Sequence, residues 1–470
     1  MTKRYLATGI CFLFGLALSL PAQWAKTYGG KSDDRAWSVI QDADGNFVVA
    51  GATESFGNGA KDMWILKLSS EGKILWQRTY GNGPYPESKA IDEAFSIEST
   101  RDGRYIAAGT TTNGRILSVD YIKFKTDGAI QWQKWVPPII ESPVRGIWLA
   151  TLESGRCIRQ SADGSFILVG QLQWLEHHDY YQWRYRSPHV YALKIDNQGI
   201  VRFRKVYGST YSGDSAFSAI PLPAGGYLIS GRTALDARSN FDAFLLKINS
   251  WGDPVWSYFY GGEKIDEAHD MALTEDGGCV LAGPTSSFGS GGYDAWILKL
   301  DAAGQIQWQK AYGGPKDDYA HAIRKTKDGG YIVAGSTSSF GSGKEDAWVF
   351  KLDKDGNLVW EKTYGGKGSD GAWVVREIKP SGYLVAGKTA SYGAGGEDVL
   401  ALRLDKNGNI DPSCGTFVGT SAAKVTKTKC FPVPASMQVS EYSEEPFEFS
   451  ANFIRYPSTG SPTVICKKEK

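Results

Sequence analysis

The chain has 470 residues, with 52 Lys and Arg against 51 Asp and Glu, so its formal net charge is +1. This balance gives no sign of a nucleic-acid partner or of a basic surface for membranes. Aromatic residues make up 13% of the chain and glycines number 56, which favours many short strands joined by tight turns over helices.

The N-terminus has the features of a secretory signal peptide. Lys3 and Arg4 precede a mostly apolar stretch, residues 5–20, and the segment ends at the small residue Ala22. The stretch is short for a membrane span, and no later apolar run approaches its length. We therefore expect cleavage after Ala22, no transmembrane span in the mature chain, and a secreted, periplasmic or cell-surface location in a bacterium. The alternative is that residues 1–22 stay as a membrane anchor.

Seven copies of one unit follow, between about residue 24 and residue 410, and four marker positions locate them. An acidic residue precedes the first strand of each copy, at Asp34, Asp92, Glu153, Asp214, Asp266, Asp318 and Asp370. A glycine ends the second apolar run, at Gly51, Gly109, Gly170, Gly231, Gly283, Gly335 and Gly387. A base lies within the third run, at Lys67, Lys123, Lys194, Lys247, Lys299, Lys351 and Arg403. An aromatic residue marks the fourth, at Trp24, Trp76, Trp132, Phe203, Trp256, Trp308 and Trp360.

Each copy predicts four strands. In the copy that runs "AHAIRKTKDGGYIVAGST" and onward, the strands fall at residues 320–326, 331–337, 347–353 and 358–364. Asp-Gly and Gly-Asn signals separate the first strand from the second and the third from the fourth, as tight hairpins require. Four-stranded units repeated four to eight times build a β-propeller. We predict an all-β fold, a seven-bladed β-propeller of four-stranded antiparallel blades over residues 23–413, with a small C-terminal tail at 414–470.

The repeat count predicts how the ring closes. Seven sets of first, second and third strands occur, but the seventh set is followed by "DPSCGT", where Pro412 disfavours a strand. The missing fourth strand lies at the other end of the mature chain, in "QWAKTYGG". We therefore predict that residues 24–28 pair with residues 398–404, which removes two exposed strand edges.

The repeats resemble the β-propeller repeat family of secreted bacterial proteins, whose units read "YGG…D.A…DG.YIVAG.T…D.W..KLD..GN..W". The resemblance covers about residues 24–410 and its motifs recur seven times. It implies a propeller and an exported protein, and it implies little about activity. The third copy departs most, because Arg156 stands where the other copies have Trp, Phe or His.

One stretch, "GYLVAGKT" at residues 382–389, satisfies the phosphate-loop pattern G-x-x-x-x-G-K-[ST]. Its counterparts in other copies are "GYIVAGST" and "GYLISGRT", and Lys388 lies where other copies have Ala, Pro or Ser. A phosphate loop needs free backbone N–H groups and a following helix, whereas this stretch predicts a buried strand. We expect no nucleotide binding.

Length differences between copies lie only in the connections that follow the second and fourth strands. In an antiparallel blade these two connections emerge on the same face. The two largest belong to the third copy, at residues 136–154 and 171–189, and residues 81–92 add a third in the second copy. One decorated sector on an otherwise regular scaffold is typical of a binding site.

The connection at 171–189 is rich in aromatic residues with hydrogen-bonding neighbours, which could stack on sugar rings or anchor a protein. The candidate ligand-binding residues are Trp174, His177, His178, Asp179, Tyr180, Trp183, Arg184, Arg186 and His189. The alternative is that they pack over the 136–154 connection as a small core. No metal site is predicted, because the two adjacent histidines and the aspartate lack a regular ligand spacing.

The repeated acidic positions predict a structural role, since a carboxylate before the first strand can accept backbone N–H groups of the YGG turn. The sequence favours an exported, monomeric, non-catalytic binding module for a glycan or a protein, without cofactor. The alternative is a secreted propeller enzyme, a quinone-dependent dehydrogenase or a glycoside hydrolase. "LKLDAAGQIQW" resembles the repeat of pyrroloquinoline quinone dehydrogenases, but their cofactor and calcium residues have no match here.

Five cysteines remain after the predicted cleavage. Cys157 and Cys279 lie within apolar strand patterns, and we expect both to be buried and unpaired. Of the three in the last sixty residues, Cys414 and Cys430 are the first choice for a disulfide, although spacing alone does not decide the pairing. The tail either attaches the propeller to a surface or partner, or covers the propeller's edge.

Overall fold

A computed structural model gives the arrangement of most of the chain. It describes residues 23–57, 60–80, 91–112, 117–136, 140–144, 147–178, 182–185, 188–208, 213–234, 240–413, 418–419, 424–428, 433–435, 438–441 and 463–467. The predicted signal peptide therefore lies outside the described residues. Within them, no helix is long and apolar enough to cross a membrane.

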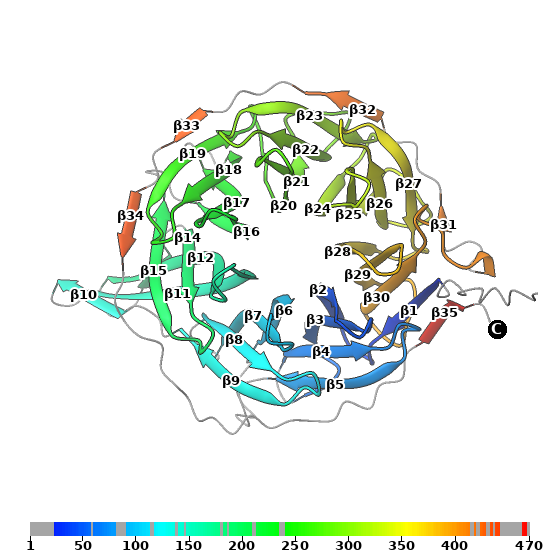
Figure 1. The fold of residues 1–470 in the computed structure, drawn as a ribbon, viewed down its shortest axis with the longest axis horizontal. Helices are drawn as coiled ribbons and strands as arrows, with labels where there is room; N and C mark the ends of the chain where they lie inside the picture. The colour runs from blue at the N-terminus through cyan, green and yellow to red at the C-terminus, as the bar shows by residue number, and fades with distance from the viewer. Residues whose placement is uncertain are drawn as a thin grey trace, which may run out of the picture.

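Seven four-stranded antiparallel blades form a ring around a central axis (Figure 1), so the predicted seven-bladed β-propeller is confirmed. Blades 1 and 2 consist of β2 (Asp34–Gln41), β3 (Phe47–Thr53), β4 (Asp62–Leu68), β5 (Ile74–Tyr80), β6 (Glu93–Ser99), β7 (Tyr105–Thr112), β8 (Leu117–Phe124) and β9 (Ile130–Trp135). Blades 3 and 4 consist of β11 (Ile147–Gln160), β12 (Phe166–His178), β14 (His189–Ile195), β15 (Val201–Gly208), β16 (Ser215–Pro221), β17 (Tyr227–Ala234), β18 (Phe241–Ile248) and β19 (Pro254–Tyr260). Blades 5 and 6 consist of β20 (Asp270–Leu273), β21 (Cys279–Thr285), β22 (Asp294–Leu300), β23 (Ile306–Gly313), β24 (Asp318–Lys325), β25 (Tyr331–Thr337), β26 (Asp346–Leu352) and β27 (Leu358–Tyr364).

Blade 7 closes the ring with both ends of the repeat region. Its strands are β28 (Asp370–Glu377), β29 (Tyr383–Thr389), β30 (Asp398–Leu404) and β1 (Trp24–Tyr28). β1 pairs antiparallel with β30, from Trp24 opposite Arg403 to Tyr28 opposite Val399. Every residue of β1 is buried. The predicted closure is confirmed, and the "GYLVAGKT" stretch is β29, which is hydrogen-bonded to a strand on each side.

The core lies between the blades, because each sheet buries both of its faces against its neighbours. The second and third strands of most blades are buried at every position, as in β3, β4, β25 and β26. One cluster joins blade 4 to blade 5, with Leu245 packed near Trp296, and another joins blade 6 to blade 7, with Val349 near Leu400. The near-continuous apolar strands of the sequence follow from this two-sided burial.

The C-terminal tail forms a belt of fifth strands on the outer edges of the blades. In chain order, β31 (Val418–Gly419) pairs with β27, β32 (Lys424–Lys427) with β23, β33 (Val433–Ala435) with β19, β34 (Gln438–Glu441) with β15, and β35 (Thr463–Lys467) with β1. The tail thus runs around the ring against the direction of the blades (Figure 1). Of the two roles considered from sequence, the described strands fit a cover for open edges. Cys414 and Cys430 lie outside the described residues.

Candidate binding face

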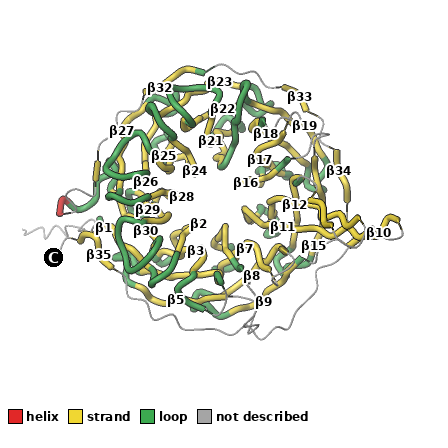
Figure 2. Tube along the Cα trace, turned by 180° about the vertical axis from the view of Figure 1, so that it is seen from behind, coloured by secondary structure: helices red, strands yellow, loops and turns green. Residues whose placement is uncertain are grey.

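Both insertions of blade 3 fold into one sheet. β10 (Ile140–Val144) pairs with the first part of β11, β11 pairs with β12 along its length, and β13 (Gln182–Tyr185) pairs with the end of β12. The resulting sheet, β10-β11-β12-β13, is continuous with blade 3 and we call its protruding part the arm. Figures 1 and 2 show that the arm projects beyond the rim of the ring, beside β34. The two connections predicted to share a face therefore build a single element.

The register of the arm sorts the predicted ligand-binding residues into rows. Trp148, His177 and Trp183 stand directly opposite one another on three adjacent strands. The next residue on the same strand, His178, lies opposite Gln182. Trp174 lies opposite Thr151. Arg184 lies within β13, whereas Asp179, Tyr180 and Arg186 lie outside the described residues.

His189 lies at the base of the arm and not in it. Its Nδ1 is 3.4 Å from Oδ2 of Asp214, the acidic repeat residue of blade 4. A Cβ at Gly208 would approach His189 Nδ1 to 2.3 Å, so the packing of this imidazole requires glycine there. A second contact ties the arm to blade 4, because Ser215 Oγ donates to Gln171 Oε1 at 2.9 Å. The base of the arm is therefore anchored to its neighbour by side chains.

The axial channel next to the arm is lined by a ring of seven equivalent residues. In six blades the innermost strand has a β-bulge three residues after the acidic position, and a bulge re-aims the residue that it inserts. The residues at this position are Trp37, Phe95, Arg156, Phe217, His269, His321 and Trp373. Distances between ring centres are 5.2 Å for Trp37–Trp373, 5.7 Å for Trp37–Phe95, 5.0 Å for Phe217–His269, 5.8 Å for His269–His321 and 4.0 Å for His321–Trp373.

Blade 3 supplies the one cation of this ring. The Arg156 guanidinium lies 4.3 Å from the ring centre of Phe95, so it occupies the place that an aromatic ring has elsewhere. Arg156 is exposed. The departure noted in the sequence thus leaves the packing regular and places an accessible positive charge in the channel near the base of the arm.

A charged cluster borders the ring in blades 4 and 5. Glu267 accepts hydrogen bonds from His269 Nε2 at 2.6 Å and from the Arg232 guanidinium at 2.7 Å. Burial alone would raise the pKa of Glu267, but the bond with His269 and the charge of Arg232 outweigh it and lower the pKa to about 2. His321, next in the ring, has its pKa held well below the usual value, first by burial and then by the nearby His269. A carboxylate held by two partners therefore borders the ring next to an imidazole whose protonation burial disfavours.

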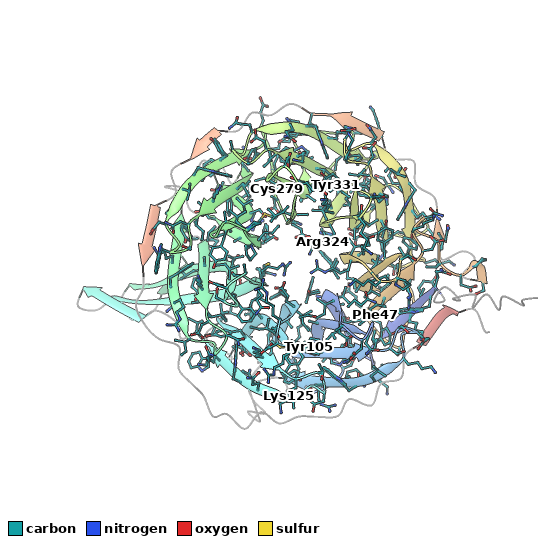
Figure 3. The ribbon with its side chains drawn as sticks, viewed as in Figure 1. Phe47, Tyr105, Lys125, Cys279, Arg324 and Tyr331 are labelled. Atoms are coloured by element: carbon teal, nitrogen blue, oxygen red, sulfur yellow. The ribbon has the colours of Figure 1, made fainter. Side chains whose placement is uncertain are left out.

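Three arginines lie deeper in the channel, three residues beyond the ring on their strands. Arg324 is ion-paired with Asp270, and its side chain lies at the central opening in Figure 3. Arg159 and Arg376 form no ion pair among the described residues, and Arg376 Nε donates to the carbonyl of Val39 at 3.1 Å. Burial, followed by the like charges of Arg324 and Arg159, lowers the pKa of Arg376 well below its usual value. Asp270 and Glu98, which is three residues beyond Phe95, supply the opposing charges at this level.

The repeated acidic residues stabilise turns by accepting hydrogen bonds. Asp34 accepts a hydrogen bond from the backbone N–H of Gly30 at 2.8 Å and another from Ser55 Oγ at 2.7 Å. The same pair of contacts recurs at Asp266, Asp318 and Asp370. Each carboxylate joins the connection that enters its blade to the connection after the second strand. These contacts are those of a structural group.

The repeated lysines pair within their own blades. In five blades the ammonium of the third-strand lysine meets an aspartate in the turn between the first and second strands. The Nζ–Oδ distances are 2.9 Å for Lys67–Asp42, 2.8 Å for Lys123–Asp102, 3.3 Å for Lys194–Asp163, 2.7 Å for Lys299–Asp276 and 3.0 Å for Lys351–Asp328. The two cysteines of the blades, Cys157 and Cys279, are buried and unpaired, as predicted.

Comparison with known proteins adds a family match over a short segment. The model of a domain of unknown function (DUF5122) beta-propeller matches residues 380–413, which contain β29 and β30. No curated protein matches the sequence significantly. Two crystal structures of Sqt1 from Chaetomium thermophilum are similar to 82% and 80% of this chain and 98% of theirs, with 10% identity and TM-scores of 0.42 and 0.40. Similarity at this level says nothing about the function of this chain.

Proposed function

We propose that this protein is an exported, non-catalytic binding module that recognises another protein through the blade 3 arm. The observation that supports the proposal is the convergence of the two blade 3 insertions into one projecting sheet. Among the residues that the structure describes, blade 3 alone carries such a projection, and a regular ring with a projecting element resembles a scaffold that presents a recognition element. The ring itself supplies rigidity, because each blade is buried on both faces.

The backbone of the arm favours a protein over a small ligand. Within the described part of the chain, β10 and β13 each pair with one strand only. A strand with an unpaired edge can accept an extended segment of a partner by main-chain hydrogen bonds. The strands of the arm carry Trp148 on β11, Trp174 on β12 and Trp183 on β13, and Trp is among the residue types that dominate binding energy in protein interfaces.

A quantitative pull-down tests the proposal. The wild-type protein and the double variant Trp174→Ala/Trp183→Ala are immobilised and incubated with the cell-envelope fraction and culture medium of the source bacterium. We expect a specific protein that the wild type enriches to be recovered about tenfold less with the double variant, as the loss of hot-spot aromatics implies. The matched control is Val359→Ala, which removes an exposed apolar side chain from β27 in blade 6 and should change nothing.

Two outcomes would contradict the proposal. Equal recovery of every enriched protein by wild type and double variant would remove the arm from the binding surface. Loss of binding to an oligosaccharide array in the double variant, with no protein affected, would assign the arm to a glycan instead. Melting curves of the variants, which should match the wild type, show that the fold is intact.

A further inference from the structure

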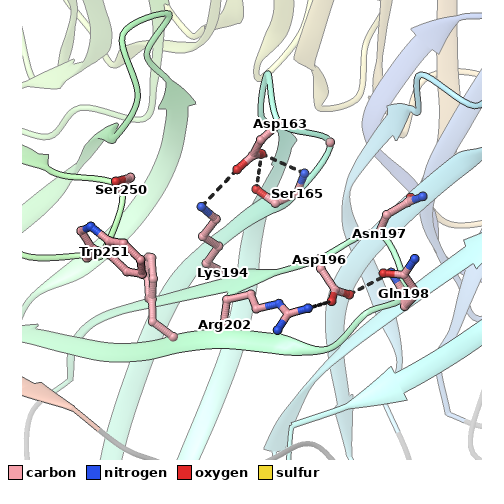
Figure 4. Close-up of a pocket in the computed structure, with 11 residues that line it drawn as sticks. Asp163, Ser165, Lys194, Asp196, Asn197, Gln198, Arg202, Ser250 and Trp251 are labelled. Carbon is pink, nitrogen blue, oxygen red and sulfur yellow. Dashed lines mark hydrogen bonds and ion pairs between the residues drawn. The ribbon is translucent and has the colours of Figure 1, made fainter.

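A groove of about 450 Å³ lies between blades 3 and 4 on the face opposite the arm. It is lined by the turns that join first to second and third to fourth strands in blade 3, and by the turn around Trp251 in blade 4. Figure 4 shows Ser250 and Trp251 on one side and the pairs Asp163–Lys194 and Asp196–Arg202 on the other. This groove was not anticipated from the sequence.

The groove lies at the blade boundary where the repeat aromatic is Phe203 instead of Trp. At the other boundaries a Trp occupies the fourth-strand aromatic position, and at five of them it lies against the turn glycine of the next blade. Trp24, Trp76 and Trp360 also donate their indole N–H to a carbonyl of that turn, at 3.1, 3.0 and 3.2 Å. At the boundary of blades 3 and 4 the residue is Phe203, which contacts the turn at Gly252 but has no N–H to donate. The equivalent carbonyl there belongs to Ser250, which lines the groove.

Trp251 is the second departure from the repeat at the same place. The residue before the turn glycine is polar or small in the other six blades: Glu71, Asp127, Gln198, Ala303, Asp355 and Asn407. Trp251 is 76% exposed, which keeps a large apolar ring in water. The turn does not depend on this ring, because Asn249 Oδ1 accepts the N–H groups of Trp251 and Asp253 at 2.8 and 2.9 Å. The indole is therefore an accessible surface on a fixed backbone.

The polar lining supplies donors and acceptors without net charge. Lys194 Nζ lies 3.3 Å from Asp163 Oδ2, and Arg202 is ion-paired with Asp196. Asp163 and Arg202 are each 57% exposed at the side chain, so these pairs remain available to a ligand. Two cations and two anions cancel, which disfavours a strongly charged ligand. An exposed aromatic ring can stack on the apolar face of a sugar ring, and the neighbouring carboxylate and cationic groups can form hydrogen bonds with the sugar hydroxyls.

We propose that this groove binds a neutral hexose-based oligosaccharide, with one sugar ring stacked on Trp251 and its hydroxyl groups on the Asp163–Lys194 and Asp196–Arg202 pairs. The proposal rests on the groove and its lining and is independent of the arm. Its two anchors are the exposed indole and the part of the groove that Phe203 lines. Each can be changed without touching the other.

Calorimetric titration with neutral hexaoses tests the site, with laminarihexaose, cellohexaose, maltohexaose and mannohexaose as probes and polygalacturonate fragments as the charged comparison. We expect saturable binding of at least one neutral hexaose by the wild type. Trp251→Ala should weaken it about 30-fold, the effect of removing a hot-spot aromatic. Phe203→Trp, which restores the repeat residue and fills the groove, should also abolish it while leaving the melting temperature unchanged or higher. Val359→Ala, which removes an exposed side chain of β27, is the matched control and should bind as the wild type does.

Several outcomes would overturn the proposal. They are the absence of binding to all neutral probes, binding confined to polygalacturonate, and wild-type affinity in either Trp251→Ala or Phe203→Trp. The second variant keeps the test decisive even if one substitution disturbs the fold, because the two act on different blades. A melting curve of each variant identifies such a disturbance.

Discussion

Strand β1 should be essential to the stability of the ring, and Trp24→Ala is the sharpest way to measure this. Trp24 is 0% exposed, and it donates its indole N–H to Ser70 O in blade 1 at 3.1 Å. Removing a fully buried Trp costs about 3–5 kcal/mol of unfolding free energy, and the lost hydrogen bond adds about 1 kcal/mol. That sum is a large part of the 5–15 kcal/mol typical of a folded domain, so the expected loss of stability is easily detected.

The assay is urea unfolding followed by circular dichroism, with Trp76→Ala as the matched control. Trp76 occupies the same repeat position and donates a similar hydrogen bond to Thr126 O at 3.0 Å, but it is only partly buried. We expect the loss at Trp24 to exceed that at Trp76 by at least about 2 kcal/mol, because the removed ring had no exposed surface. Deletion of residues 23–30 should lower the melting temperature sharply. Equal losses for the two Trp variants, together with an unchanged melting curve for the deletion, would refute ring closure by β1.

Three further substitutions have definite expected outcomes in the same unfolding assay. Burial, and then the charge of Asp92, raises the pKa of Asp120 from 3.8 to about 8, so the free energy of unfolding should fall as pH rises between those values. Asp120→Asn should flatten this dependence and raise the free energy of unfolding at pH 7 by up to about 4 kcal/mol. An unchanged pH profile in the variant would contradict this expectation. The pKa of His321 is lowered in the folded protein, so the free energy of unfolding should fall as pH drops below about 6.5. His321→Phe should therefore stabilise the protein more at pH 5 than at pH 8. An equal effect at both pH values would be inconsistent with a neutral imidazole in the folded state. Asp318 accepts from Gly314 N at 2.7 Å and from Ser339 Oγ at 2.7 Å, so Asp318→Ala should cost about 3 kcal/mol, whereas a loss below about 0.5 kcal/mol would deny it a structural role.

Repetition explains why so much of the fold follows from the sequence. Each of the seven copies predicts the same four strands, so where the turn or the apolar run of one copy leaves a strand boundary open, another copy defines it. The predicted strand at residues 358–364 is β27 without any shift, and the missing fourth strand pointed directly to the pairing of β1 with β30. Comparison of copies also excluded a phosphate loop at residues 382–389, and the structure places that stretch in β29 between two paired strands.

Features that occur once were harder to predict. The five pairings of the tail have no repeat pattern, and short segments such as Val418–Gly419 acquire their strand conformation from the edge that they cover. The union of the two blade 3 insertions depends on pairing between segments that the sequence treats as separate loops. The axial ring depends on a bulge, which shifts the facing of one residue per strand and is invisible to a two-residue periodicity.

The groove between blades 3 and 4 did leave a signal in the sequence. Phe203 stands where six copies have Trp, and Trp251 stands where six copies have smaller or polar residues. Each exception alone resembles ordinary variation. Whether the two residues line one groove depends on contact between a fourth strand and the turn of the next blade. That contact becomes visible only when the blades are arranged in the ring.

Site-specific photo-cross-linking tests the role of the arm most directly. A photo-activatable p-benzoyl-phenylalanine replaces Trp183 on β13 in one variant and Ala303, an exposed turn residue on the opposite face, in another. Both proteins are irradiated in the presence of the envelope fraction of the source bacterium. We predict that the substitution at 183 yields a discrete cross-linked protein partner and that the substitution at 303 does not. The same products from both positions, or no product from position 183, would contradict recognition of a protein through the arm.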